Sequence, residues 1–357
     1  MDNEKYKIVQ IIDTLEPGGA ERVLITIANI LFSKGHQVAV ITTLHEGKLA
    51  NQLCKGITLK VLNRKSKWNL ADMKKLIEWC QSFDIIHVHS THNLRYLFLA
   101  SIIFGLHKKI FFHHHFGNIE IDQSVQWTEK WILPKTIVIA VSRKIYEWTI
   151  DKIKMNKQHV YLLPNIVQKQ LSGFGLHQQS SELQIVLVAN FRAAKNIEFA
   201  VDLMHHLIQQ QKAHLTIVGQ VADENYCNNI KSKIEELSLT NYITIVHNCT
   251  NVSAILHQFD IAIHTATSES GPLVLIEYMA AGLPFLTYKT GEVVYQIEND
   301  LSECVIDEFE ISAWIRQINR LLQMNRDDFY NKLQHEYTSL YSEDAYYKAL
   351  IAIYSAT

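Results

Sequence analysis

The sequence lacks the features that identify several large classes of proteins. It has no excess charge of one sign, since 34 Lys and Arg residues are balanced by 36 Asp and Glu residues, and the formal net charge is −2. Proteins that coat nucleic acid normally carry a large positive excess, so we expect no nucleic-acid partner. With 48% hydrophobic and 20% charged residues, the composition is neither disordered nor fibrous.

Cysteine is scarce and long apolar runs are missing. The five cysteines are an odd number, and no two form a Cys-x-x-Cys pair, so we expect neither a disulfide framework nor a zinc ribbon. We find no secretory signal, and the longest apolar run, near residues 96–106, falls short of the roughly 20 residues that span a bilayer. A buried helix is the simplest interpretation of this run, with membrane-surface contact as the alternative. We expect a cytoplasmic protein.

Apolar, β-rich runs alternate with helical patterns along the chain. The strands expected in the first half are Lys7–Ile12, Gln37–Thr43, Ile57–Leu62, Ile85–His89, Lys109–His113, Ile137–Val141 and Val160–Leu163. Those expected in the second half are Gln184–Ala189, His214–Gly219, Ile243–His247, Ile261–His264 and Pro284–Thr287. Nearly continuous apolar strands that alternate with helices indicate parallel sheets covered on both faces.

We therefore predict an α/β fold with two Rossmann-like domains that face each other across a deep cleft. The expected division is a first domain at 1–167, a polar linker at 168–183, a second domain at 184–335, and a C-terminal helix at 336–357 that packs on the first domain. Because ligands of open parallel sheets bind beyond the carboxyl ends of the strands, the loops that follow the strands should carry the functional residues.

Two such loops contain groups suited to phosphate. Gly18 and Gly19 follow the first strand and open a helix, where a ligand can approach the backbone and its N–H groups. They do not form the G-x-G-x-x-G pattern of dinucleotide-binding proteins, and a plain tight turn is the alternative. Arg192 and Lys195 follow the first strand of the second half. Their two positive charges are able to hold a diphosphate, and a solvated turn is the alternative.

A third segment places two carboxylates, Glu269 and Glu277, around the start of a helix. Leu273 and Val274 would offer free backbone N–H groups at the positive end of that helix. A carboxylate inside a core-facing helix is costly unless it holds a partner. A ribose diol is a suitable partner for Glu277, because a carboxylate accepts both hydroxyl protons.

Together these segments resemble the retaining glycosyltransferases of family 4, which have the GT-B fold. The resemblance rests on four motifs that occur in the family's order: Gly18-Gly19-Ala20-Glu21, Pro164-Asn165, Arg192-x-x-Lys195 and Glu269-x7-Glu277. It implies that the second domain holds a nucleotide-sugar donor. Glu277 would bind the ribose, and Glu269 would face hydroxyls of the donor sugar as a catalytic group. The residues assigned to the donor phosphates are Gly18, Gly19, Arg192, Lys195, Leu273 and Val274.

Histidine is unusually frequent, with 18 residues. His87 and His89 lie at the end of one expected strand, and His113–His115 lie at and just after the end of the next. The resemblance places a catalytic histidine near the donor sugar, and His114 and His115 are the candidates. A zinc site is conceivable but not expected, because no cysteine or carboxylate accompanies these histidines at metal spacing. The remaining histidines would then be core or cleft-lining imidazoles.

The resemblance implies that a sugar, most simply from a UDP-sugar, is transferred with retention to a hydroxyl of a saccharide or lipid-linked acceptor. No metal or other cofactor is expected, because Arg192 and Lys195 supply the positive charge. The expected setting is bacterial surface polysaccharide or glycolipid assembly. A basic stretch could bring the protein to the inner face of an anionic membrane, or could simply be solvated; it comprises Lys60, Arg64, Lys65, Lys67, Lys74 and Lys75.

The sequence also departs from the family pattern. Pro272 stands at the helix start, where it removes one N–H donor, and Ile166 replaces a usual glycine. These departures keep one alternative open, a catalytically inactive nucleotide-sugar-binding partner subunit. A nucleotide-sugar 2-epimerase, which shares the GT-B architecture, is the second alternative.

Overall fold

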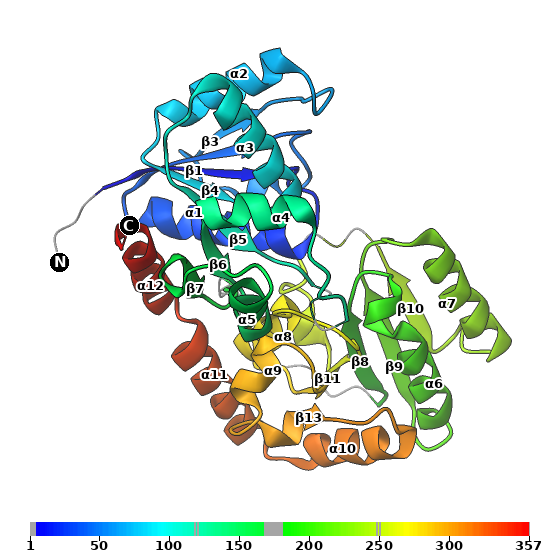
Figure 1. The fold of residues 1–357 in the computed structure, drawn as a ribbon. Helices are drawn as coiled ribbons and strands as arrows, with labels where there is room; N and C mark the ends of the chain where they lie inside the picture. The colour runs from blue at the N-terminus through cyan, green and yellow to red at the C-terminus, as the bar shows by residue number, and fades with distance from the viewer. Residues whose placement is uncertain are drawn as a thin grey trace. The chain divides into compact units, whose positions relative to one another are not determined.

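The structure is a computed structural model that describes residues 5–117, 119, 121–167, 181–247, 249 and 251–356. The chain forms two compact units. The first consists of Met1–Val167 and Glu343–Thr357, and the second of Gln168–Ser342 (Figure 1). Each unit contains one parallel β-sheet with helices packed on it, and none of the described helices is long and apolar enough to cross a membrane.

The first unit is built on a sheet of seven parallel strands in the order β3-β2-β1-β4-β5-β6-β7. The strands are β1 (Lys7–Ile12), β2 (Gln37–Thr42), β3 (Thr58–Val61), β4 (Ile85–Val88), β5 (Ile110–His114), β6 (Ile137–Ala140) and β7 (Val160–Leu162). The helices are α1 (Gly19–Ser33), α2 (Leu70–Gln81), α3 (Thr91–Phe104), α4 (Trp127–Ile132), α5 (Arg143–Asp151) and α12 (Glu343–Ser355).

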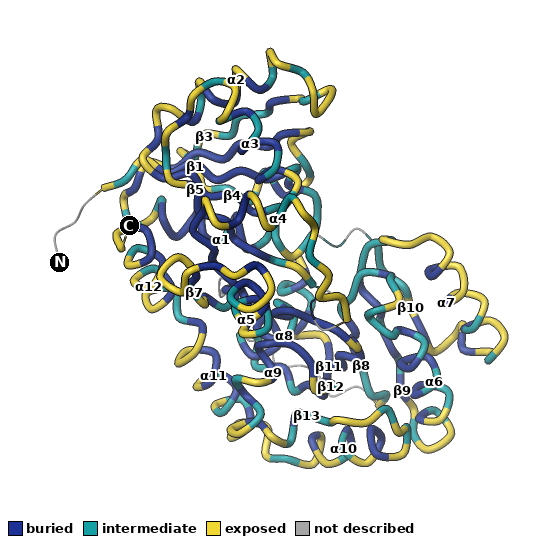
Figure 2. Tube along the Cα trace, viewed as in Figure 1, coloured by how far each residue is buried: buried dark blue, intermediate teal, exposed yellow. Residues whose placement is uncertain are grey.

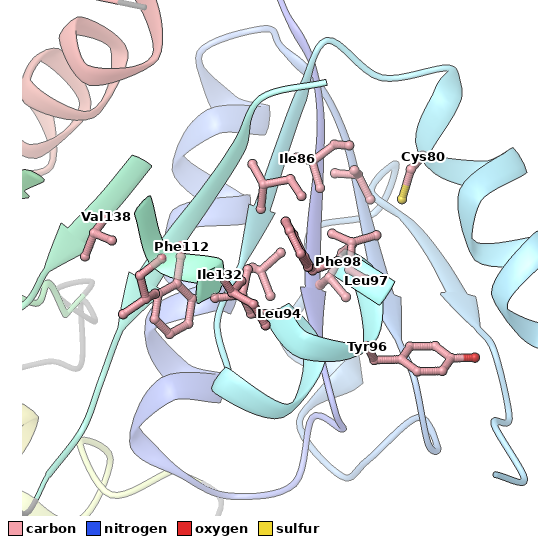
Figure 3. Close-up of a cluster of buried hydrophobic side chains, with 14 of the residues drawn as sticks. Cys80, Ile86, Leu94, Tyr96, Leu97, Phe98, Phe112, Ile132 and Val138 are labelled. Carbon is pink, nitrogen blue, oxygen red and sulfur yellow. The ribbon is translucent and has the colours of Figure 1, made fainter. Parts of the chain in front are cut away.

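Each face of this sheet has its own core, because successive side chains of a strand point to opposite faces. On one face, Ile86, Phe112 and Val138 pack with apolar side chains from α2, α3, α4 and α5 (Figure 3). Each fully buried side chain of this size contributes about 1.5–3 kcal/mol through removal of apolar surface from water. The helices α2 to α5 therefore owe their positions chiefly to this continuous apolar layer.

The other face includes the residues that alternate with that layer, and α12 packs there. Tyr354 of α12 contacts the rings of His87 on β4 and Phe111 on β5. Lys34, directly after α1, forms an ion pair with Asp344. These contacts join the C-terminal helix to the first unit, although more than two hundred residues separate it in sequence from β5.

The second unit contains six parallel strands in the order β10-β9-β8-β11-β12-β13. The strands are β8 (Leu183–Val188), β9 (Ala213–Val218), β10 (Ile243–Val246), β11 (Ile261–His264), β12 (Phe285–Tyr288) and β13 (Val305–Ile306). The helices are α6 (Ile197–Leu207), α7 (Glu224–Glu236), α8 (Leu273–Ala281), α9 (Glu292–Ile297), α10 (Ile311–Gln323) and α11 (Arg326–Tyr341).

The two sheets share one topological feature that positions a binding site. In each sheet the strand order reverses once, between β1 and β4 in the first and between β8 and β11 in the second. At such a switch point the connections leave in opposite directions, so a crevice opens beyond the carboxyl ends of the two strands. The loops after β1, β4, β8 and β11 are therefore the places to examine.

The predicted fold class is confirmed: both units are α/β with parallel sheets of Rossmann type. The apolar run near residues 96–106 is largely helix α3, although Ile102 and Ile103 at its end are exposed. The edge strand β13 was missed, because two residues give no recognisable period.

The boundaries differ in detail from those expected. Of the linker expected at 168–183, residues 168–180 lie outside the described residues, and Leu183 already belongs to β8. The division expected at 336 falls inside α11, and the units divide after Ser342. The physical reason is that α11 packs on α8, where the Gln334 side chain donates to the carbonyl oxygen of Met279.

Candidate active site

Four helices, three of which follow predicted site loops, begin at a residue whose side chain makes no capping hydrogen bond. They are α1 after β1, α6 after β8, α8 after β11 and α9 after β12. By contrast, α2, α3, α5 and α7 each begin at an Asn, Ser or Asp whose side chain accepts a backbone N–H. An uncapped helix N-terminus leaves N–H groups and the positive end of the macrodipole for other partners, and anions are such partners.

A chain of polar contacts crosses the switch point of the second sheet. The Lys195 ammonium group, from the loop after β8, forms an ion pair with Glu269 Oε1, from the loop after β11. The same oxygen lies 3.2 Å from Nε2 of His264 at the end of β11. The other ring nitrogen of His264, Nδ1, lies 3.0 Å from Thr287 Oγ1 on β12. Three neighbouring strands thus contribute to one network.

The network holds Glu269 as a carboxylate. Burial alone would raise the pKa of Glu269, but the Lys195 charge and the contact with His264 outweigh burial and lower the pKa to about 2. The side chains of Lys195 and Glu269 are only 13% and 8% exposed, so water screens the pair little. An ammonium group has three N–H donors, so Lys195 keeps donors for a second anion beside Glu269.

Backbone contacts fix the loops that carry this pair. Thr265 Oγ1 donates to the carbonyl oxygen of Lys195, and Thr267 N donates to that of Ala194. From the next loop, Gly291 adopts a φ of 84°. A Cβ atom at Gly291 would lie 2.9 Å from Glu269 Cβ, so only glycine fits this close approach. The position of the Glu269 carboxylate is therefore set by three loops.

Helix α8 carries the remaining residues predicted for this unit. Leu273 and Val274 form its first turn, where N–H groups have no acceptor within the helix. Glu277 follows one turn later and is buried. The neighbouring Tyr278 is also buried, and its hydroxyl accepts from the backbone N of Val188 at the end of β8. This contact anchors α8 beside the switch point.

Arg192 stands at the start of the turn that contains Lys195. Its side chain is half-buried, and its Nε is buried with no hydrogen-bond partner among the described residues. A buried guanidinium N–H without a partner is costly, so a ligand with acceptor oxygens would relieve it.

In the first unit, Gly18 is the N-cap of α1 and Gly19 its first residue. The Glu21 carboxylate folds back toward Gly18, since a Cβ there would lie 2.1 Å from Glu21 Oε2. Burial raises the pKa of Glu21 to about 7, and the negative charge of Asp13 at the end of β1 adds to this effect. The turn after β1 therefore holds an acid that ionises near neutral pH.

The histidines of β5 divide between the two faces of the first sheet. His114 packs on the side of α5, against the ring of Trp148, and is buried. His115 points to the other side, where its Nε2 lies 3.2 Å from His89 Nδ1. Burial lowers the pKa of His114 to about 4 and that of His115 to about 3, so both are neutral at pH 7. His115 is also the more exposed of the two.

The structure thus brings Lys195 and Glu269 into direct contact and sets Leu273, Val274 and Glu277 on the adjoining helix. Gly18, Gly19, His114 and His115 belong to the first unit. Sequence reasoning missed His264, Thr287 and Gly291. The signal for His264 was available, since it is a polar residue at the carboxyl end of an apolar strand. Nothing in the sequence pairs Thr287 with it.

Comparison with known proteins decides the family. Residues 17–171 match the family model "Glycosyltransferase Family 4", and residues 173–338 match "Glycosyl transferases group 1". The two matches together cover almost the whole chain, in the order expected. The chain belongs to the family 4 glycosyltransferases.

Relatives of this glycosyltransferase are distant in sequence. It is 24% identical over 249 residues to the N-acetyl-alpha-D-glucosaminyl L-malate synthase of Bacillus anthracis, covering 65% of this chain and 64% of that protein. It is 23% identical over 336 residues to an uncharacterised glycosyltransferase of Haemophilus influenzae, covering 92% of each. The chain thus spans slightly less than two thirds of the first relative and nearly all of the second.

Solved structures agree on the fold. The glycosyltransferase matches the crystal structure of Anabaena HepE in complex with UDP and glucose with a TM-score of 0.80, covering 99% of this chain and 100% of that chain. The sequence identity in this match is 17%. Such a likeness shows the GT-B fold, as the sequence predicted.

Proposed function

We propose that this glycosyltransferase moves a sugar from a UDP-sugar to an acceptor hydroxyl with retention at the anomeric carbon. The observation that carries the proposal is the buried contact between Lys195 and Glu269 across the switch point of the second sheet. It joins a cation suited to a phosphate with a carboxylate suited to sugar hydroxyls. These two chemistries are adjacent in a nucleotide sugar, because the sugar is bonded directly to the β-phosphate.

In the proposed step, the bond between the anomeric carbon and the β-phosphate oxygen breaks, and its electron pair leaves with UDP. The acceptor oxygen attacks from the same face and forms the new glycosidic bond. Its proton passes to the departing phosphate oxygen, so the enzyme needs no separate base. Positive charge develops on the sugar ring, which the Glu269 carboxylate stabilises, and negative charge develops on UDP.

The proposed role of Lys195, Arg192 and the first turn of α8 is to stabilise that leaving group. Donors held in place before the reaction need no reorganisation when charge appears, and one such donor contributes about 3 kcal/mol in comparable sites. Glu277, one turn into α8, is proposed to accept hydrogen bonds from the ribose. The proposed phosphate contact of Gly18 and Gly19 is supported by the uncapped start of α1 and by the family resemblance.

We further propose that the transfer needs no metal ion at the phosphates, because Arg192 and Lys195 provide the charge that a metal would otherwise supply. In buffer free of divalent cations, initial rates should change less than about twofold when Mg²⁺ or Mn²⁺ is added, far below the effect of losing one charged donor. Activity that appears only after Mn²⁺ is added would overturn this part of the proposal.

The decisive experiment for the transfer is a donor screen followed by product analysis. UDP-, GDP- and ADP-sugars are compared by thermal shift, since a ligand that binds the native state raises its apparent stability. The best donor is then incubated with and without simple glycosides, and the anomeric configuration of the product is read by NMR. We expect a UDP-sugar and a retained configuration. An inverted product would contradict the proposed step.

Two variants separate the alternatives. Glu269→Gln should abolish both transfer and slow donor hydrolysis, whereas Glu236→Gln, at an exposed acid of the same unit, should leave both unchanged. UDP binding without turnover in the wild-type protein would favour the inactive partner subunit, which Pro272 and Ile166 kept open. Conversion of UDP-N-acetylglucosamine to its 2-epimer without any acceptor would favour the epimerase.

We propose that the acceptor side meets an anionic membrane surface. On one face of the first sheet, Lys74 and Lys75 of α2, Ile102 and Ile103 of α3, and two tryptophans of α4 are exposed. Figure 2 colours stretches of these helices as exposed. On α4, Trp127 is 77% exposed and Trp131 51%, and Lys135 lies over the Trp131 ring. Of the basic stretch, Lys67 lies over the exposed Trp68. Exposed tryptophan beside lysine suits the interface of a bilayer with anionic headgroups.

This contact would place the enzyme at the inner face of the cell membrane, next to a lipid-linked acceptor used in surface polysaccharide or glycolipid assembly. Co-sedimentation with phosphatidylglycerol vesicles tests it, with phosphatidylcholine vesicles for comparison. Trp127→Ala with Trp131→Ala should release the protein, and Tyr242→Ala in the second unit should not. Equal binding to neutral and anionic vesicles, or none, would contradict the proposal.

A further inference from the structure

A group of buried imidazoles lies inside the first unit, on the sheet face that α12 contacts. His87 belongs to β4, His89 follows it directly, and His113 belongs to β5. One ring nitrogen from each of the three lies within 4.8 Å of those from the other two. All three side chains are almost fully buried, at 0%, 2% and 0% exposure. Their strands are adjacent and parallel, and the ring centroids of His89 and His113 lie 5.2 Å apart.

Several nitrogens of this group lack hydrogen-bond partners. Neither ring nitrogen of His113 has a partner among the described residues, and neither does Nε2 of His87. A buried polar atom without a partner costs about 1–3 kcal/mol. Three such atoms in one place point to a group that occupies the space between the rings, an ion or a water molecule.

The hydrogen bonds that do exist engage one ring nitrogen of His87 and one of His89. Nδ1 of His87 lies 2.7 Å from the hydroxyl of Tyr354 on α12. Nε2 of His89 lies 2.8 Å from Oε1 of Gln10 on β1. A ligating histidine commonly donates its second ring N–H to such an oxygen, which fixes the ring and directs the remaining lone pair to the metal. This leaves Nε2 of His87 and Nδ1 of His89 for coordination.

A fourth ligand is available where the strands end. His115 Nε2 lies 3.2 Å from His89 Nδ1, and His115 is less buried than the other three histidines. In tetrahedral zinc with Zn–N bonds of about 2.0–2.1 Å, two ligand nitrogens lie about 3.3 Å apart. The separation of these two atoms therefore already matches one edge of a zinc tetrahedron. The part-exposed side of His115 also offers an entry path.

We propose that His87, His89, His113 and His115 form a divalent transition-metal site, with Zn²⁺ as the expected ion. Neutral imidazole is a good ligand for zinc, and the site holds no carboxylate that would favour Mg²⁺ or Ca²⁺. The ion would link β4 to β5 and, through Tyr354, fix α12 on the sheet. The proposed metal site belongs to the first unit, whereas Lys195 and Glu269 belong to the second.

The sequence predicts no zinc site, because no cysteine or carboxylate accompanies the histidines at metal spacing. The four ligands come from two strands that are neighbours only in the folded sheet, so a local spacing pattern cannot reveal them.

The test uses tag-free full-length protein expressed in zinc-supplemented medium and dialysed against metal-free buffer. We expect about one zinc per chain by mass spectrometry and a zinc X-ray absorption spectrum dominated by imidazole nitrogen, with bonds of about 2.0 Å. Protein refolded with Co²⁺ should show the intense visible absorption of tetrahedral cobalt. Zinc below a tenth of an equivalent, or a spectrum dominated by oxygen ligands, would overturn the proposal and assign the space to water.

Variants sharpen the result. His113→Phe and His87→Gln should each lower zinc content at least tenfold, whereas His159→Gln, at an exposed histidine of the same unit, should not change it. Equal zinc in His113→Phe and the wild type would show binding at the surface and overturn the proposal. If His113→Phe does not fold, the absorption spectrum of the wild-type protein still decides, because the buried cluster is the one group of three or more possible ligands found among the described residues.

Discussion

The two sheets have the same order of strands around their switch points. The side chains that follow the carboxyl ends of those strands, however, differ in charge. In the second unit, the switch point is crossed by a charged pair, Lys195 and Glu269, which His264 supports. In the first, the corresponding loops carry neutral imidazoles, and Glu21, whose pKa burial raises to about 7. The topology provides a crevice in both units, but the side chains after the strands decide what each crevice can hold. The charged pair of the second unit suits the proposed diphosphate, and the histidines of the first unit suit the proposed metal.

The largest effect is expected from removing the cation. Lys195→Met should lower kcat/KM by about a thousandfold or more, because it removes a phosphate donor and leaves Glu269 buried without its partner. The loss of a buried partner should also lower stability by about 3–5 kcal/mol. Initial rates and urea unfolding measure the two effects.

A double variant separates these two effects. Lys195→Met with Glu269→Gln should recover stability, because neither charge remains, but should not recover activity. Lys231→Met, at an exposed lysine of the same unit, is the matched control. Activity that returns together with stability would show that Lys195 is only structural.

The next largest effect is a loss of folding stability at acid pH, caused by protonation of Glu269. The pKa of Glu269 is lowered from its ordinary value of 4.5 to about 2, so its ionised form stabilises the folded state above about pH 4.5. This contribution, up to about 3 kcal/mol, should be lost as pH falls from 4.5 toward 2. In Glu269→Gln the unfolding free energy should depend less on pH across this window. An unchanged pH profile by chemical denaturation would show that Lys195 and Glu269 are not paired in solution.

A smaller effect on donor binding is expected from Glu277, the residue proposed to bind the ribose. Glu277→Gln should raise the KM for the donor about tenfold with less change in kcat, since the proposed contact acts on a part of the donor that does not react. Donor titrations against Glu236→Gln measure it. A fall in kcat with unchanged KM would move Glu277 from ribose binding to the chemical step.

The smallest expected effect is on the pH dependence of stability through Glu21 in the first unit. Because the folded-state pKa of Glu21 is raised to about 7, the folded protein holds a proton that the unfolded chain releases, and stability should fall as pH rises from about 4.5 to 7. Glu21→Gln should remove this loss and raise stability above pH 7 by roughly 1–3 kcal/mol. Thermal unfolding at pH 5 and pH 8 measures it. A variant less stable than the wild type at pH 8 would mean that the Glu21 carboxylate is paired when ionised.

Much of the second unit's site could be predicted from the sequence because its residues lie at fixed local positions. Lys195 follows β8, Glu269 follows β11, and Leu273 and Val274 open α8, so strand ends and a helix start were enough to find them. The contact between His264 and Thr287 was not predicted, because it joins two different strands. The register between two strands cannot be deduced from the sequence of either strand alone.

The sequence alone determined three features: the succession of strands along the chain, their continuous apolar character, and the loops that contain the phosphate-binding candidates. Each of these depends only on residues that are neighbours along the chain. Only the tertiary structure decided which sheet face His114 and His115 each take, and that His87, His89 and His113 come together from two neighbouring strand ends. The physical reason is that pleating and strand pairing, which bring distant residues together, arise from packing of the whole unit.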